Sequence, residues 1–104
     1  MEPGEPYLEV QVDTDRSPVL VVARGEVDAA SAPQLQAAFE ATSPAGGIDL
    51  DLAEVTFMDS SGLRVITAAR REIHEAGGTL EIVAAGAAVR RIFEMTGLSS
   101  LLAD

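Results

Sequence analysis

The residues with the clearest chemical potential are Asp59, Ser60, Ser61 and Gly62, which stand between a strand-like and a helix-like segment. A serine at the start of a helix accepts hydrogen bonds from backbone N–H groups of the first turn, so either serine can cap this helix. The same position suits phosphorylation, because those N–H groups and the helix dipole stabilise a phosphate. A phosphate of about −1.5 to −2 charges beside Asp59 repels an apolar or acidic partner while the helix stays folded. The junction therefore predicts either a structural cap or a phosphorylation site that controls binding.

A catalytic serine is a third interpretation of this junction, but it lacks partners. The chain's one histidine is His74, near the far end of the helix that Ser60 starts. Fourteen helical residues separate the two side chains by about 21 Å at 1.5 Å per residue. The Gly-x-Ser-x-Gly turn of serine hydrolases is absent as well. We therefore expect no enzyme activity, and we expect His74 to be a solvated residue of the last helical turn.

The other candidate metal-binding and phosphate-binding residues are better explained as surface residues and as turns. Asp49 and Asp51 point the same way from one strand, but hard cations draw about six oxygens from several loops, so a solvated strand face is the better interpretation. The glycine pairs at 46–47 and 77–78 lack the spacing of phosphate loops and predict turns. We expect no metal and no cofactor.

Composition limits the possible partners and the size of the fold. The 104 residues fit one domain, 1–104, with a loose segment over 1–6. Seven basic against 17 acidic residues give a net charge of −10, which disfavours nucleic acid and anionic membranes as partners. The chain has no cysteine, and its acidic start lacks the basic region of a signal peptide, so a cytoplasmic location is expected.

The hydrophobic pattern predicts the elements that position the junction. Alternating or continuous apolar runs predict strands, and apolar residues at helical spacing predict three helices, the first of them capped by Ser31. The predicted strands cover 7–12, 18–25, 48–52 and 79–83, and the short segment 54–58 leads into the junction. The helices follow Ser31, Gly62 and Gly86, and residues 98–104 can add only an edge fragment. The strict alternation over 48–52 leaves one sheet face in water. The predicted fold is α/β, with a mixed sheet of four to five strands and helices packed on one face.

Four segments together resemble a known family. They are Gly25-Glu26-Val27-Asp28, Ile48-Asp49-Leu50-Asp51-Leu52, the run from Val55 to Leu63 and the run from Val89 to Leu98. In order and spacing they resemble a STAS domain of the bacterial anti-sigma factor antagonist type, over about residues 7 to 102. The string Phe-Met-Asp-Ser-Ser-Gly-Leu is the specific part of this resemblance.

The resemblance implies a regulated binding protein. Unmodified antagonists of this family capture an anti-sigma factor that is also a serine kinase, which liberates the sigma factor. The kinase inactivates the antagonist by phosphorylating a serine, and a serine phosphatase restores it. Matched to this sequence, the phosphoacceptor is Ser60. The docking surface then comprises Asp28, Asp59, Ser61, Gly62, Leu63 and Arg64, where Arg64 replaces the family's frequent glycine.

A second function on the same fold remains open from the sequence. STAS domains also serve as constitutive subunits of signalling scaffolds and of transport complexes, without a phosphorylation switch. The apolar strand around Val19 to Ala23 and the exposed helix faces are compatible with such an assembly. For the switched antagonist we expect a monomer or a weak dimer.

Overall fold

The structure, a computed structural model, describes residues 7–103. The predicted loose segment 1–6 lies outside the described residues. The described elements are β1 (Leu8–Asp13), β2 (Val19–Val27), α1 (Ala32–Glu40), η1 (Pro44–Gly46), β3 (Ile48–Met58), α2 (Ser60–Glu75), β4 (Leu80–Ala85), α3 (Ala87–Met95) and η2 (Ser99–Leu101). This order confirms the predicted α/β fold.

One mixed sheet organises the molecule, with its strands in the order β1-β2-β3-β4. β1 and β2 form an antiparallel hairpin, while β2 pairs with β3 and β3 with β4 in parallel. The strand predicted at 48–52 continues through 54–58 as one strand, β3, whose pairing with β2 shifts register along its length. Leu102 adds a single parallel bridge to Ile82 at the β4 edge, so four strands and a one-residue fifth match the prediction.

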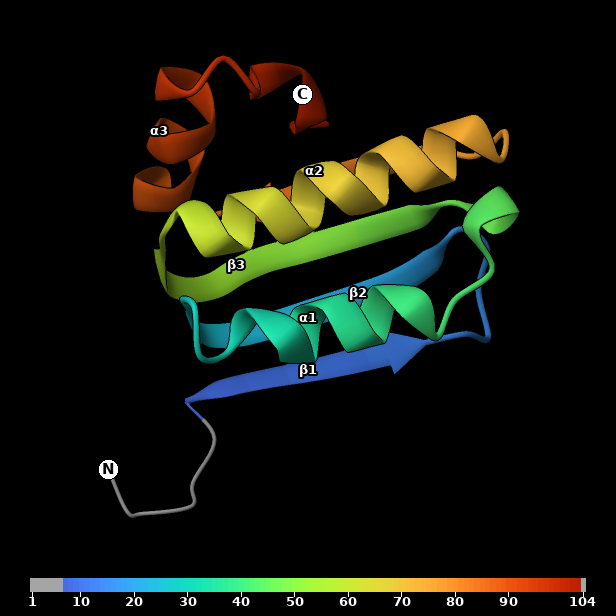
Figure 1. Cartoon of the computed structure of the whole chain (residues 1–104), viewed down its shortest axis with the longest axis horizontal. Helices are drawn as coiled ribbons and strands as arrows, with labels where there is room; N and C mark the ends of the chain where they lie inside the picture. The colour runs from blue at the N-terminus through green and yellow to red at the C-terminus, as the bar shows by residue number, and fades with distance from the viewer. Residues whose placement is uncertain (1–6, 104) are drawn as a thin grey trace.

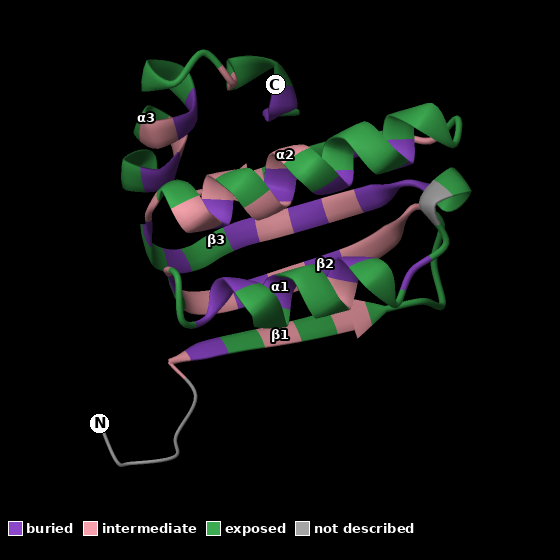
Figure 2. Cartoon of the chain, viewed as in Figure 1, coloured by how far each residue is buried: buried purple, intermediate pink, exposed green. Residues whose placement is uncertain are grey.

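The helices α1 and α2 lie side by side on one face of the sheet (Figure 1). Their apolar residues meet the inward residues of the strands, and the core includes Val21, Leu35, Leu50, Ile66 and Ile73, each no more than 3% exposed. In Figure 2 the buried residues are seen on β3 and on one side of α1 and α2, with exposed residues on the outer helix faces. Burying aliphatic side chains in this layer drives folding, at about 25 cal/mol per Å² of apolar surface.

The other face of the sheet is open over the residues that the structure describes. It carries acidic side chains from β1, β3 and β4, together with the exposed Phe57 and Val83. The third helix, α3, packs against β3 and η2 at one end of the sheet rather than beside α1 and α2 (Figure 1). Among the described residues, no helix is long and apolar enough to cross a bilayer.

The parallel pairing of β2 with β3 decides where the functional candidates meet. Each strand leads into a helix, so the N-terminal ends of α1 and α2 lie at the same end of the sheet (Figure 1). The connection after β2 and the start of α2 touch directly, because the Asp59 N–H donates to the Val27 carbonyl over 3.1 Å. Residues about thirty positions apart in the sequence therefore form one surface.

Candidate functional site

The start of α2 is capped by Asp59. Its backbone is extended (φ −112°, ψ −169°), and its carboxylate accepts a hydrogen bond from the Ser61 N–H over 2.8 Å. The prediction that a serine caps this helix is therefore wrong, and α2 begins at Ser60, three residues earlier than predicted. The physical reason is that Asp59 is the last extended residue after β3, so its side chain is the one placed over the first turn.

Ser60 is the first residue of α2, and it is exposed. Within residues 7–103 its hydroxyl has no hydrogen-bond partner, and the cap of the helix is supplied by Asp59 instead. The neighbouring Ser61 is half-buried and faces α1. Ser60 is thus the more exposed of the two serines, at the positive end of the helix dipole.

The loop between β2 and α1 forms the second half of the site, and its polar groups are engaged with one another. The Asp28 carboxylate accepts hydrogen bonds from the Tyr7 hydroxyl (2.9 Å), the Ala30 N–H (2.9 Å) and the Ser31 N–H (3.1 Å). The bond from Tyr7, with the bonds from this loop, holds the pKa of Asp28 below its ordinary value, against the opposing effect of desolvation. The same contact raises the pKa of Tyr7.

Ser31 occupies the predicted N-cap position of α1, but its side chain caps nothing in that helix. The hydroxyl is buried, donates to the Glu26 carbonyl over 2.7 Å and accepts from the Asp28 N–H over 3.0 Å. Ser31 therefore closes the loop onto itself. Pro33 in the first turn of α1 lacks an N–H, which reduces the need for a side-chain cap.

The three residues after Ser61 contribute in different ways. Gly62 is buried, and a Cβ there would lie 2.8 Å from both the Met58 Cγ and the Val27 Cγ1, so the absent side chain lets α2 start directly on the sheet. Leu63 is half-buried against the core, and Arg64 is exposed. Of these three, Arg64 offers the most accessible side chain for a partner.

Tyr7 was not among the site residues predicted from the sequence, yet it contacts Asp28. Its hydroxyl reaches Asp28 because the β1–β2 hairpin pairs Leu8 with Gly25, which sets the residue before β1 beside the residues after Gly25. Gly25 has φ +113°, and a Cβ there would lie 2.0 Å from the Tyr7 carbonyl oxygen. The signal was present in the hairpin pattern, since counting back from the turn places Tyr7 opposite Glu26.

The remaining candidates lie away from this surface or are engaged in surface contacts. His74 is exposed in the last turn of α2, as predicted. Asp49 forms an ion pair with Arg16 at 2.7 Å. Among the described residues, no three histidine, aspartate or glutamate side chains are arranged to hold a metal ion.

Comparison with known proteins identifies similar chains. The family model described as "Mlab, STAS domain" matches residues 10–103. The anti-sigma-B factor antagonist of Listeria monocytogenes is 37% identical over 92 residues, covering 86% of this chain and 79% of that protein. The anti-sigma-B factor antagonist of Bacillus subtilis is 28% identical over 96 residues, covering 91% and 88%.

Solved structures share the fold over nearly the same range. An anti-sigma factor antagonist from Mycobacterium paratuberculosis superposes with a TM-score of 0.78 at 29% identity, covering 92% of this chain and 83% of that one. The antagonist SpoIIAA in its unphosphorylated form gives a TM-score of 0.78 at 24% identity, covering 92% and 87%.

Proposed function

The chain belongs to the STAS domain family, and on that basis we propose that it is an anti-sigma factor antagonist that phosphorylation of Ser60 switches off. The unmodified protein binds an anti-sigma factor that is also a serine kinase, and the sigma factor is released. The kinase transfers the γ-phosphate of ATP to the Ser60 oxygen, and a serine phosphatase hydrolyses the phosphoester. The proposal includes action in the cytoplasm and a monomer or weak dimer as the oligomeric state.

The observation that carries this proposal is the exposed Ser60 hydroxyl beside a helix cap that does not need it. Because Asp59 supplies the cap, a phosphate on Ser60 breaks no hydrogen bond within the described residues. The hydroxyl stands at the N-terminus of a 16-residue helix, where the dipole favours negative charge. The fold therefore tolerates the modification, and its effect falls on whatever docks there.

The proposed docking surface surrounds Ser60 and is formed by the loop between β2 and α1 and by the start of α2. We assign to it Asp28, Asp59, Ser61, Gly62, Leu63 and Arg64, of which Gly62 acts through its backbone and its close packing. A phosphate adjoining Asp59 adds about two charges to a chain of net charge −10, so it repels an apolar or acidic partner surface at this point.

Two structures of SpoIIAA support the expectation that this fold tolerates phosphorylation. SpoIIAA in its unphosphorylated form and Bacillus SpoIIAA in its phosphorylated form superpose on this chain with TM-scores of 0.78 and 0.73, at 24% and 23% identity. Both forms have the fold described above, so in that protein phosphorylation leaves the architecture intact.

The test uses the anti-sigma factor kinase encoded in the same genome, with ATP. We expect the protein to gain one phosphate by mass spectrometry, Ser60→Ala to gain none, and the matched variant Ser61→Ala to gain one. Ser60→Asp should weaken kinase binding at least tenfold in calorimetry, while the circular dichroism spectrum stays unchanged. Phosphate uptake that persists in Ser60→Ala would contradict the assignment of the acceptor.

The same variants separate the antagonist from a constitutive scaffold or transport-complex subunit. Size-exclusion chromatography of the protein with its cellular partners should show a small complex that Ser60→Asp dissolves. A stable large assembly indifferent to Ser60→Asp would instead support the constitutive function.

A further inference from the structure

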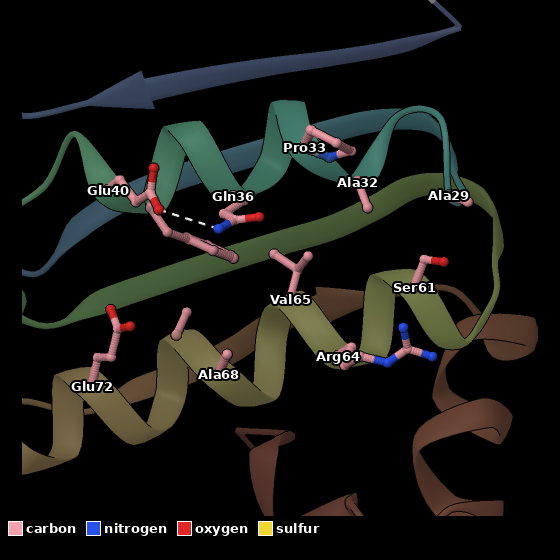
Figure 3. Close-up of a pocket in the computed structure, with 12 residues that line it drawn as sticks. Ala29, Ala32, Pro33, Gln36, Glu40, Ser61, Arg64, Val65, Ala68 and Glu72 are labelled. Carbon is pink, nitrogen blue, oxygen red and sulfur yellow. Dashed lines mark hydrogen bonds between the residues drawn. The ribbon is translucent and has the colours of Figure 1, made fainter.

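A groove of about 340 Å³ runs between α1 and α2 on the outer side of the helix layer (Figure 3). Its floor is apolar and consists of Ala32, Phe39, Val65 and Ala69. It opens at Ser61 and Arg64, directly behind the Ser60 junction, and it extends to Glu72. From Ser61 to Glu72 the wall formed by α2 is about 16 Å long at 1.5 Å per residue, which equals three helical turns.

The two ends of the groove carry opposite charge. At the far end, Glu40 of α1 and Glu72 of α2 stand on opposite walls (Figure 3). The Gln36 side chain donates to the Glu40 carboxylate over 3.2 Å, but neither glutamate has an ion-pair partner within residues 7–103. At the near end, Arg64 likewise has no carboxylate partner in that range. A groove with this pattern complements a ligand that is basic at one end and apolar along its length.

We propose that this groove seats a surface helix of the anti-sigma factor, with a lysine or arginine of that helix between Glu40 and Glu72. The inference rests on the proposed function and extends it, because it adds a second contact to the docking surface at Ser60. The groove and the phosphorylation site are continuous through Ser61 and Arg64. A partner helix bound in the groove therefore ends beside Ser60, where a phosphate on Ser60 would contact it.

The chemistry of the groove favours a helix over an extended segment. The walls are two helices whose backbone groups bond within themselves, so no sheet edge is open to an incoming strand. An extended segment would leave its own N–H and C=O groups without partners over the apolar floor. A helix satisfies its backbone internally and lays an apolar face on Ala32 and Val65.

Charge disfavours a second copy of this chain as the occupant. Each copy carries a net charge of −10, so pairing two copies brings 20 excess negative charges together. The carboxylates Glu40 and Glu72 would add to that repulsion at the contact itself. A partner with basic residues removes it.

The experiment compares two double variants of equal net charge. Glu40→Lys/Glu72→Lys reverses the far end of the groove, while Glu75→Lys/Glu81→Lys changes the same number of exposed glutamates outside it. A third variant, Ala68→Trp, fills the groove from an exposed position of α2. Circular dichroism and thermal unfolding establish that each variant is folded, and calorimetry with the anti-sigma factor kinase gives the dissociation constant.

We expect the groove double variant and Ala68→Trp to weaken binding at least tenfold, and the control double variant to change it less than threefold. Groove variants that bind like the parent, while Ser60→Asp abolishes binding, would overturn the groove assignment and leave the proposed function standing. A parent that does not bind the kinase at all overturns both. A parent dimer in sedimentation that Ala68→Trp dissociates would assign the groove to a second copy and overturn the inference.

Discussion

Two connections of similar composition lie in contact at one end of the sheet, and they differ in how their polar groups are used. In the loop after β2, the Asp28 carboxylate and the Ser31 hydroxyl are engaged with Tyr7 and with the loop's own backbone. In the connection after β3, Asp59 caps the helix and the Ser60 hydroxyl is exposed, without a partner among residues 7–103. Ser31 is 2% exposed.

The difference shows that residue type does not decide which serine side chain is buried and hydrogen-bonded and which is exposed. Each connection pairs an aspartate with a serine at the start of a helix, yet Ser31 is buried while Ser60 is exposed. A hydroxyl whose bonds hold a loop together cannot be modified without loss of those bonds. Under the proposed function, the loop after β2 is the support and the start of α2 is the surface that phosphorylation modifies.

The largest expected effect is a loss of folding stability when the Ser31 hydroxyl is removed. Ser31→Ala removes the partner of both the Glu26 carbonyl and the Asp28 N–H, so we expect a loss of about 2 kcal/mol in the free energy of unfolding. Ser60→Ala should change it by less than about 0.5 kcal/mol. Urea unfolding of the two variants measures both values. Equal losses would mean that Ser60 is also a structural residue.

A second prediction concerns the start of α2, where the exposed Ser60 is followed by the tightly packed Gly62. Two residues after the exposed Ser60, Gly62→Ala places a methyl group 2.8 Å from the Met58 and Val27 side chains, and we expect a loss of about 1.5 kcal/mol from overpacking. Gly46→Ala is the matched control, because a Cβ there meets nothing within 4 Å. Thermal unfolding compares the two. A neutral Gly62→Ala would show that α2 can lift from the sheet at its N-terminus.

The smallest expected effect is the pH dependence that Asp28 confers. Its pKa is lowered in the folded state, so the stabilisation it provides is complete above its ordinary value of 3.8 and is lost as the pH falls through the lower folded-state value. Tyr7→Phe removes the first cause of this shift, so the pKa of Asp28 should rise towards 3.8.

Carbon-detected NMR titration of the Asp28 carboxyl group measures that change directly. An Asp28 titration unaffected by Tyr7→Phe would show that the loop backbone alone sets the low pKa.

Much of the fold could be predicted from local pattern. The alternation over 48–52 places Ile48, Leu50 and Leu52 in the core, and Gly77, with φ +94°, ends α2 where the sequence indicated. The position of the site was also predictable, since parallel strands followed by helices bring their connections to one end of a sheet. The cap was mistaken because the first helical residue depends on where β3 ends, and that boundary follows from pairing with β2.

By itself the sequence determined the order of the elements, the acidic surface and the placement of two serines at a strand-to-helix junction. Only the tertiary structure decided which hydroxyl is accessible, because Ser31 is buried by partners that the hairpin and the loop deliver to it. It also decided that α1 and α2 leave an apolar groove between two carboxylates and an arginine. Hydrophobic periodicity is a property of neighbours along the chain. Whether a polar group has a hydrogen-bond partner depends on atoms that only folding brings within about 3 Å.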